Sequence, residues 1–396
     1  MPGPLHGVRI LDLTTVVMGP FATQILAELG ADVIKIETHE GDNMRHVGPL
    51  RNAGMGHLYI NLNRGKRSVV LDLKQPEGRE ALMRLVPGAD ALVYNVRPSA
   101  MARLKLAYDD VRAVNPRLVY VGCYGYSERG PYAGRAAYDD LIQGATGLPW
   151  LVSREGADAP RYVPVNLADR VTGLHVVYAV TAALFQRERS GQGQSVEVPM
   201  FESITHFVLG DHLAGLSWDP AIGPTGYPRL AHRRPYATSD GYLCVLVYND
   251  KQWKSFLEAI GRAELWDDPR FNSHGRRAKH IDEVYEVLAG IMKTRSSAQW
   301  MELLDRADIP FARLNKPEET VADAHLNESG FFVTEEHPTE GRMRAMRTPT
   351  DWSVSKPDLP APALPLGAHS AEVLREAGYS DTQIEQLAAR GVTRLG

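Results

Sequence analysis

The sequence predicts an α/β protein whose core is a parallel sheet with helices on both faces. Short runs of β-branched residues alternate with helical patterns through the first half of the chain, and this alternation is typical of parallel strands joined by crossover helices. The chain has 396 residues, of which 44% are apolar and 23% are charged. That length accommodates about two to three domains, and that composition excludes general disorder.

The first elements form one βαβ unit. A strand is expected at 8–14, a helix at 21–29 that ends at Gly30, and a second strand at 32–37. Further strands are expected at 68–73, 91–95, 117–123 and 194–198. The helices expected between them lie at 76–86, 100–114 and 170–189.

The second half of the chain begins with a Gly/Pro-rich stretch, residues 210–234, which has little periodicity and is interpreted as a linker. A second unit is expected to start at Pro235. Its predicted elements are a strand at 242–248 and helices at 253–260, 281–293 and 298–306. We interpret 315–350 as a return linker with strand pieces, and we expect a last helix at 371–377.

Composition excludes several classes of function. Lys plus Arg number 44 and Asp plus Glu number 48, so the net charge of −4 does not favour binding to nucleic acid or to an anionic membrane. The start of the chain has no targeting signal, and the most apolar segment, 171–185, is too short and too polar to span a bilayer. We therefore expect a soluble, cytoplasmic protein.

Metal sites are not expected. The only two cysteines, Cys123 and Cys244, exclude a disulfide scaffold and a Cys-based zinc site, and both are expected to be reduced thiols in strands. The 13 histidines show no metal-ligand spacing, and the HExxH motif is missing. The loop after the first strand, TTVVMGP at 14–20, matches neither GxGxxG nor a Walker loop, which argues against a nicotinamide enzyme.

Asp169 is the most informative acidic residue, because it stands at the start of the predicted long helix. One interpretation is an ordinary N-cap, whose carboxylate accepts hydrogen bonds from free backbone N–H groups. The other is a nucleophile that the helix N-terminus keeps ionised and oriented. Spacing alone leaves both interpretations open.

Basic residues occur at two places near predicted strand ends. Arg97 and Arg103 follow the strand at 91–95, where an open parallel sheet binds its ligands, so they suit a phosphorylated ligand. A solvated helix face is the alternative interpretation for this pair. Arg64, Lys66 and Arg67 form a second basic run, which we interpret mainly as solvated surface.

Several segments together resemble the class III CoA-transferases, the family of formyl-CoA transferase and carnitine CoA-transferase. The resemblance covers essentially the whole chain and is densest in the first 210 residues. The matching motifs are LHGVRILDLT at 5–14, GPFATQILAELGADVIKIE at 19–37, Gly41-Asp42 with Arg45, NLNRGKRS at 61–68, LDLK at 71–74, PEG at 76–78, YGY at 124–126, GPY at 130–132, AYD at 137–139 with Gln143 and Gly147, Asp169 with Thr172-Gly173, GQGQ at 191–194, and Thr238 with DGY at 240–242.

The resemblance implies a fold and an assembly. It implies an interlocked homodimer, in which each subunit has a large Rossmann-like domain built from both chain ends and a smaller α+β domain between them. The large CoA-binding domain would comprise 1–209 and 315–396, the small domain 235–314, and the linker 210–234.

The resemblance also implies site residues and an activity. The catalytic Asp of the family matches Asp169. Coenzyme A would contact Val16, Leu71, Leu73, Lys74, Asn95, Val96, Arg97, Arg103, Tyr138 and Asp139. The implied reaction moves coenzyme A from an acyl-CoA to a small free carboxylic acid through mixed anhydrides and an aspartyl-CoA thioester. Backbone N–H groups, including those at the helix start after Asp169, would stabilise the oxyanions. No metal or redox cofactor is implied, because the coenzyme A thioester is itself a substrate.

Two alternative functions remain. α-Methylacyl-CoA racemases share the fold and the Asp, but they need a second base, and the aligned Tyr138 is a poor base because the reference pKa of tyrosine is about 10. His175 lies further along the predicted helix and is interpreted as a core or interface histidine. A non-catalytic acyl-CoA-binding protein is the second alternative, and the retained Asp169 argues against it.

The chain departs from formyl-CoA transferase at several positions. Val17 stands where that enzyme has a Gln that contacts its oxalyl group, and Thr38 replaces a basic residue that contacts coenzyme A. The glycine-run loop of that enzyme has no counterpart, and the segment here is LAHRRPY at 230–236. These differences argue against oxalate as the substrate. Arg233 and Arg234 have two open interpretations, contacts to a dicarboxylate or a surface pair.

Overall fold

The structure, a computed structural model, describes residues 3–153, 158–227 and 233–396. The chain divides into two compact units. The first unit comprises Met1–Val152, Pro160–Val208 and Ser329–Gly396, and the second comprises Ser153–Ala159 and Leu209–Glu328. The functional domain limits expected from the sequence stay a prediction.

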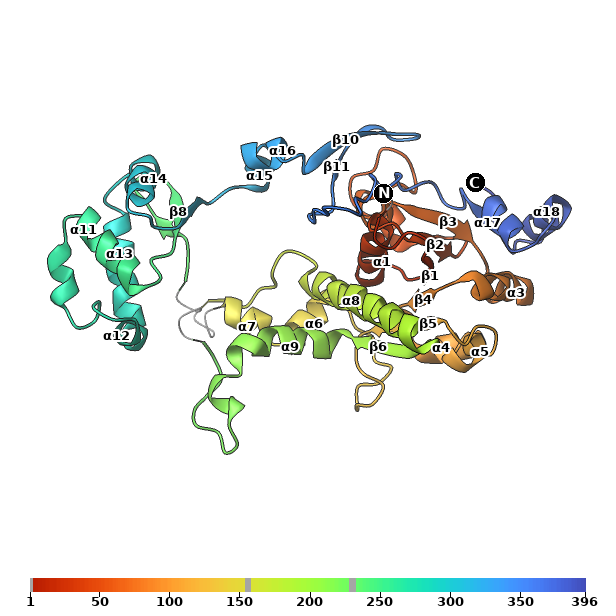
Figure 1. Ribbon diagram of the computed structural model, residues 1–396, viewed down its shortest axis with the longest axis horizontal. Coiled ribbons are helices and arrows are strands. Elements are labelled where there is room, and N and C mark those ends of the chain that lie inside the picture. The colour runs from red at the N-terminus through yellow and green to blue at the C-terminus, as the bar shows by residue number, and fades with distance from the viewer. Residues whose placement is uncertain (1–2, 154–157, 228–232) are drawn as a thin grey trace. The chain divides into compact units, whose positions relative to one another are not determined.

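A six-stranded parallel sheet forms the core of the first unit (Figure 1). The strand order is β3-β2-β1-β4-β5-β6, and the pairing register places Leu11 of β1 between Ile34 of β2 and Leu92 of β4. The predicted α/β class with a parallel sheet is confirmed. The strands are β1 (Arg9–Leu13), β2 (Asp32–Glu37), β3 (Lys66–Val70), β4 (Ala91–Tyr94), β5 (Val119–Tyr124) and β6 (Ser195–Pro199).

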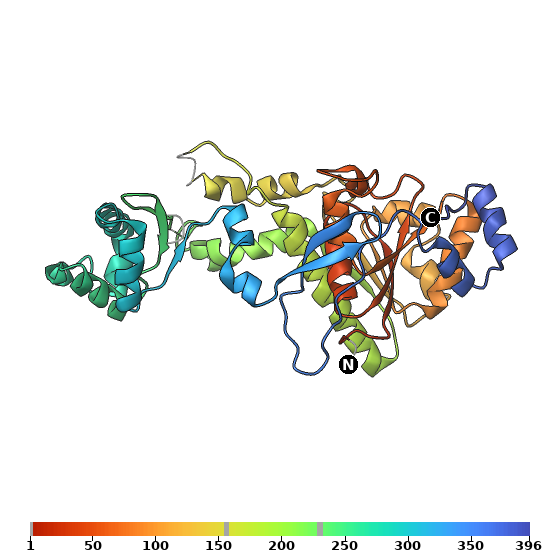
Figure 2. The same cartoon turned by 90° about the horizontal axis from the view of Figure 1, so that it is seen from above.

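Helices cover both faces of this sheet, each over its own apolar layer (Figure 2). One face is covered by α1 (Met18–Glu28), α6 (Asp139–Ala145), α8 (Leu167–Ser190) and α9 (Met200–His212). The other face is covered by α3 (Pro76–Leu85), α4 (Pro98–Arg103), α5 (Tyr108–Arg112), α17 (Ser370–Glu376) and α18 (Asp381–Ala389). Shorter elements of this unit are η1 (Asn43–His46), α2 (His57–Asn63), η2 (Val86–Gly88) and α7 (Leu148–Val152).

The helix predicted at 100–114 is wrong as a single element. It is two short helices, α4 and α5, because Lys105 between them adopts a left-handed φ of +53° that a helix cannot contain. The strand predicted at 68–73 begins earlier, at Lys66, and ends at Val70. The other strands of the sheet lie within two residues of their expected bounds.

Helix α8 is long and packs closely against α1. It ends at Gly191, whose φ of +73° is the left-handed conformation that commonly terminates helices. At Gly173 the two helices approach so closely that a Cβ would lie 2.9 Å from the Met18 carbonyl oxygen. Because Asp169 precedes Gly173 by about one helical turn, it lies on the same side of α8, toward the start of α1.

The C-terminal segment closes the edge of the sheet at β3. His369 donates its backbone N–H to the Ser68 carbonyl oxygen at 2.9 Å, and Ser370 Oγ accepts the Val70 N–H at 3.0 Å. Asp72 donates its N–H to the Val392 carbonyl oxygen at 2.8 Å. Within the predicted return linker, β10 (Phe332–His337) and β11 (Gly341–Met346) form an antiparallel hairpin.

The second unit has a small antiparallel sheet and its own helical core. Its strands are β7 (Tyr236–Ala237), β8 (Tyr242–Val245) and β9 (Phe311–Arg313). Its helical segments are η3 (Ala214–Ser217), α11 (Asp250–Ala259), η4 (Ala263–Asp267), α12 (His274–Lys279), α13 (Ile281–Met292), α14 (Ser297–Arg306), α15 (Pro317–Val321) and α16 (Ala324–Glu328). Part of the predicted linker, residues 228–232, lies outside the described residues.

Over the residues with described structure, no helix has both the length and the apolar character needed to cross a membrane. In the same part of the chain, no group of three or more His, Cys, Asp and Glu side chains is placed to hold a metal ion.

Candidate active site

The strand order reverses between β1 and β4, and the loops after these strands are joined at that point. Asn95, directly after β4, accepts the Thr15 N–H on Oδ1 at 3.0 Å and donates Nδ2 to the Thr15 carbonyl oxygen at 2.7 Å. Open parallel sheets bind ligands at such a reversal, beyond the carboxyl ends of the strands. This edge of the sheet is therefore where a ligand site is expected.

Two adjoining hollows lie at this edge. The first, of 330 Å³, contains Asp169 and is here called the Asp169 hollow. The second, of 350 Å³, extends over the ends of β2 and β3 and is here called the Leu71 hollow. Thr15 and Val96 line both, so the two hollows meet at the loops after β1 and β4.

Asp169 is the third residue of α8, and its side chain is 8% exposed. Asn166 occupies the N-cap position, so the interpretation of Asp169 as the N-cap is wrong. Its backbone N–H is donated to Asp139 Oδ1 at 2.9 Å, whereas its carboxylate makes no hydrogen bond to any described residue. Burying a carboxylate without a hydrogen-bond donor costs free energy of folding, and such groups are typical of sites that bind a ligand.

The surroundings of Asp169 change its acidity. Burial is the main reason that the pKa of Asp169 is raised to about 7; the nearby Asp139 carboxylate contributes to this rise, and Arg170 partly opposes it. A carboxylate with a pKa near neutrality is uncommon outside functional sites. Near pH 7 a large fraction of Asp169 is ionised and therefore nucleophilic, yet poorly solvated.

Asp139 lines neither hollow but contacts the backbone of Asp169. It is buried at the first position of α6 and accepts the Gln143 Nε2 hydrogen on Oδ2 at 2.6 Å. Gln143 in turn accepts the Val163 N–H at 3.0 Å, which ties the approach to α8 to α6. Asp139 therefore fixes where the first turn of α8, and with it Asp169, begins.

Free backbone N–H groups lie at the start of α1 rather than after Asp169. The Asp169 N–H is taken by Asp139 and the Arg170 N–H by the Asn166 carbonyl oxygen, so the expectation of free donors at these two positions is wrong. The N–H groups of Val17 and Met18 have no acceptor among the described residues, and both residues line the Asp169 hollow.

The loop before α1 is conformationally strained. Val16 has a φ of +72°, a left-handed conformation that costs a β-branched residue about 1–3 kcal/mol. Val16 lines the Asp169 hollow, and Val17 lines it as well. Strain of this kind persists only where surrounding contacts hold it in place.

The predicted coenzyme A contacts divide into three groups. The Asp169 hollow is lined by Val16, Asn95, Val96, Arg97 and Tyr138. The Leu71 hollow is lined by Leu71, Leu73, Lys74 and again Val96, together with Thr38. Arg103 and Asp139 line neither hollow. Arg103 is exposed at the last position of α4, so only Arg97 of the predicted arginine pair lines a hollow.

Arg135, which was not predicted from the sequence, also lines the Asp169 hollow. It is exposed, and its guanidinium carbon lies 4.3 Å from the centre of the Tyr132 ring. Its position three residues before Tyr138 was the available signal. Arg97 and Arg135 thus place two cations at the rim of the hollow that holds Asp169.

The interpretation of Arg64, Lys66 and Arg67 as solvated surface is wrong. Arg64 and Lys66 are 2% and 5% exposed, and Lys66 Nζ lies 3.0 Å from Asp12 Oδ2. Arg67 forms ion pairs with Asp32 at 2.7 Å and with Glu376 at 2.6 Å. The available signal was that Asp12 and Lys35 also interrupt otherwise apolar strands, so buried charges had to be paired.

Two residues considered as alternatives are poorly placed for proton transfer. Tyr138 is 65% exposed, so it is not held as a buried base. His175 follows Asp169 by six residues, which turns it to a different side of α8. Burial and the neighbouring His206 lower the pKa of His175.

Arg233 and Arg234 lie in the second unit, where they line a 510 Å³ hollow together with apolar residues such as Val245 and Phe311. Arg234 forms an ion pair with Glu286 at 2.6 Å, which favours the surface-pair interpretation for that residue. The rest of the segment at 230–232 lies outside the described residues.

Comparisons with known proteins point to one family. A model of the family described as CoA-transferase family III matches residues 5–370. A succinate–glutarate CoA-transferase from Agrobacterium fabrum is 33% identical over 94% of this chain and 95% of its own. A formyl-CoA:oxalate CoA-transferase from Streptomyces avermitilis is 33% identical over 99% of this chain and 100% of its own. The crystal structure of a CaiB/BaiF family protein from Brucella suis superposes with a TM-score of 0.80 at 30% identity, over 95% of this chain and 100% of that one.

The match spans nearly the whole chain and includes the strands, loops and helices that build both hollows. The predicted family and the predicted enzyme class, a CoA-transferase, are confirmed. The chain belongs to CoA-transferase family III.

Proposed function

We propose that this enzyme transfers coenzyme A from an acyl-CoA to a free carboxylic acid, with Asp169 as the nucleophile. One observation carries the assignment of Asp169: its carboxylate is nearly buried, has no described hydrogen-bond donor, and lies in a hollow at the strand-order reversal. An unsatisfied carboxylate at a ligand site is a group that a substrate completes.

Coenzyme A is proposed to lie across both hollows. The Leu71 hollow, with the apolar side chains of Leu71 and Leu73 and the ammonium of Lys74, suits the nucleotide end. The pantetheine arm would pass Val96, which both hollows share, and bring the thioester to Asp169. Arg97 at the rim suits a phosphate group. Asp139 and Arg103, which line neither hollow, would act indirectly.

The chemistry proceeds by two acyl exchanges. An oxygen of the Asp169 carboxylate attacks the thioester carbonyl, the C–S bond breaks, and coenzyme A leaves as a thiolate while a mixed anhydride forms. The thiolate then attacks the Asp169 carbonyl carbon, which releases the donor acid and leaves an aspartyl-CoA thioester. The acceptor acid repeats these steps in reverse. The free N–H groups of Val17 and Met18 would stabilise the tetrahedral oxyanions. The scheme uses no metal and no redox cofactor.

The acceptor is proposed to be a short dicarboxylic acid. The relatives reported above are named for succinate, glutarate and oxalate, which all carry two carboxylates. Arg97 and Arg135 form no ion pair with a described residue, so one can hold a phosphate of coenzyme A and the other the distal carboxylate. Val17 in place of Gln argues for an acceptor longer than oxalate. An exchange screen of mono- and dicarboxylic acids, read by mass spectrometry of the acyl-CoA products, tests this proposal.

Covalent trapping tests the role of Asp169. Enzyme supplied with acyl-CoA and then hydroxylamine should carry a hydroxamate at Asp169, because hydroxylamine attacks the activated carbonyl of that residue. Asp169→Asn should carry none, and Asp140→Asn, which changes an exposed carboxylate on α6, should be labelled like the wild type. A racemase or a binding protein gives no adduct. An unmodified Asp169 during continuing acid exchange would refute the proposal.

We also propose that the enzyme is an interlocked homodimer and that it works in the cytoplasm. Along one face of α8, Leu174, Tyr178 and Phe185 are 51%, 59% and 60% exposed, which is typical of a surface that a partner covers. Sedimentation at micromolar concentration should give about twice 43.8 kDa, and a stable monomer would refute the dimer. Cys123 and Cys244 are free thiols, as expected in a reducing compartment.

A further inference from the structure

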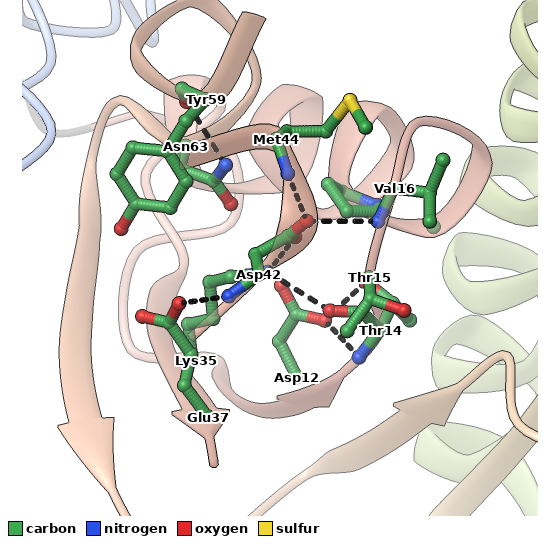
Figure 3. Close-up of polar contacts among 12 residues, drawn as sticks. Asp12, Thr14, Thr15, Val16, Lys35, Glu37, Asp42, Met44, Tyr59 and Asn63 are labelled. Carbon is green, nitrogen blue, oxygen red and sulfur yellow. Dashed lines mark hydrogen bonds and ion pairs between the residues drawn. The ribbon is translucent and has the colours of Figure 1, made fainter. Parts of the chain in front are cut away.

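The strained loop at Val16 is hydrogen-bonded to a buried polar network in the first unit (Figure 3). Lys35 and Asp42 are completely buried there, and Lys35 Nζ lies 2.9 Å from Asp42 Oδ2. The network continues to Asp12 and Glu37, which are also buried. Buried charges of this kind are stable only when they are paired and hydrogen-bonded, and these are.

Every polar backbone group of the two peptide units before Val16 is held by a side chain. In the peptide that joins Thr14 to Thr15, Lys35 Nζ donates to the Thr14 carbonyl oxygen at 2.8 Å, and Asn95 Oδ1 accepts the Thr15 N–H at 3.0 Å. In the peptide that joins Thr15 to Val16, Asn95 Nδ2 donates to the Thr15 carbonyl oxygen, and Asp42 Oδ1 accepts the Val16 N–H at 3.1 Å. The side chains of Lys35, Asp42 and Asn95 therefore determine the orientation of these two peptides without a ligand.

Asp42 is the centre of this arrangement. Its Oδ1 accepts the N–H groups of Val16 and Met44, and its Oδ2 accepts a hydrogen from Lys35 (Figure 3). Burial disfavours the Lys35 ammonium, but Asp42, Asp12 and Glu37 together raise the pKa of Lys35, so the charged pair persists. No neutral side chain can accept from both sides in this way, because an amide has one accepting oxygen and one donating nitrogen.

We propose that Asp42, oriented by Lys35, is a positioning residue of the transfer reaction, which holds Val16 in its left-handed conformation and so sets the wall of the Asp169 hollow. The inference rests on the proposed function of that hollow. The peptide held by Asp42 is followed directly by Val17 and Met18, which line the same hollow and whose N–H groups have no acceptor among the described residues. A shift of this wall moves the oxyanion donors, and misplacement by about 1 Å costs on the order of a hundredfold in rate.

The test removes the backbone strain at position 16 and asks whether activity returns. Asp42→Asn should lower kcat by about tenfold to a hundredfold with a smaller change in KM for acyl-CoA, and it should raise the ratio of acyl-CoA hydrolysed to acyl-CoA transferred, because water reaches the anhydride past a loosened wall. The double variant Val16→Gly/Asp42→Asn should recover part of the lost kcat, because glycine adopts a φ of +72° without strain. Val16→Ala/Asp42→Asn should not recover, since alanine keeps the strain.

Two further measurements separate positioning from general stability. Arg187→Met breaks an ion pair outside this network, with Asp90 near the other end of α8, and does not touch the Val16 peptide, so it should lose stability while the hydrolysis-to-transfer ratio stays within twofold of wild type. In the otherwise natural chain, Val16→Gly should unfold at a higher denaturant concentration than Val16→Ala, a comparison that stands even if Asp42→Asn fails to fold.

The outcomes distinguish this inference from the proposed function. If wild-type enzyme forms the hydroxamate at Asp169 but glycine at position 16 recovers no more activity than alanine, the positioning role of Asp42 is refuted and the mechanism stands. A reverse order of stability for the two Val16 variants also refutes the role. If wild-type enzyme forms no hydroxamate during exchange, the covalent mechanism fails first.

Discussion

Two buried aspartates of the first unit, Asp12 and Asp169, have opposite surroundings. Burial alone would raise the pKa of Asp12, but Lys66, Lys35 and the hydroxyls of Thr14 and Thr23 lower it to about 2. Burial raises the pKa of Asp169 to about 7, and no described group donates a hydrogen bond to its carboxylate. The charge of Asp12 is balanced by its neighbours, whereas the carboxylate of Asp169 has no described donor and is the group that we propose reacts with the substrate. The contrast separates structural charge from reactive charge by their partners rather than by their depth.

The largest effect is expected for Asp169→Asn. Transfer should fall by at least a thousandfold, because the amide cannot form the anhydride. The variant should also be more stable than wild type at pH 8, by roughly 2–4 kcal/mol. The folded state of the wild type raises the pKa of Asp169, so the stability from this group is present below pH 4 and lost as the pH rises through about 7. Denaturant unfolding at pH 5 and pH 8 checks the sign, and equal stability of the two proteins at pH 8 contradicts it.

Asp12→Asn should instead destabilise the fold. Removing one member of a buried ion pair typically costs about 3–5 kcal/mol, because Lys66 would stay buried without its partner. The folded state lowers the pKa of Asp12, so its contribution is present above pH 4 and lost as the pH falls toward 2. Chemical denaturation at pH 7 measures the loss. A loss of less than about 1 kcal/mol in the free energy of unfolding would show that the charge of Asp12 does not stabilise the fold and would contradict its contrast with Asp169.

Arg97 and Arg103 sharpen the comparison at the rim of the site. Arg97→Ala should raise KM for acyl-CoA about tenfold and reduce its salt dependence, because a phosphate contact is lost. Arg103→Ala should change KM less than about twofold, since Arg103 lines neither hollow. Steady-state kinetics at two ionic strengths distinguish them. Equal effects of the two substitutions would place Arg103 at the site after all.

The smallest effect is expected for Asp139→Asn. The asparagine oxygen can still accept the Asp169 N–H, but the negative charge that raises the pKa of Asp169 is gone. In wild type, kcat/KM should rise with pH through about 7 as Asp169 ionises. In the variant this limb should move to lower pH, so the variant keeps more of its activity at pH 6. A pH profile that stays in place shows that Asp139 does not set the acidity of Asp169.

The sequence predicted the sheet well because its strands are short β-branched runs between turn residues. Asp169 and eight of the ten coenzyme A contacts expected from family motifs line at least one of the two hollows, but most of the other lining residues were not predicted. The sequence missed the two short helices around Lys105, whose left-handed conformation has no strong signal in a lysine. It also missed the placement of Asp139 beneath Asp169 and the pairing of Lys66 with Asp12, because these contacts join segments 30 and 54 residues apart and depend on packing.

The closure of β3 by the C-terminal segment has a consequence for synthesis on the ribosome. Ser68 finds its partner His369 only after 301 further residues have been added. At about 5–20 residues per second, the edge of the nascent sheet stays unpaired for roughly 15–60 s. Exposed strand edges are templates for aggregation, so the demand for chaperones should be greatest during that interval and should end when residues 369–392 emerge. Slow codons shortly before that segment would lengthen the interval, and a lower soluble yield would follow.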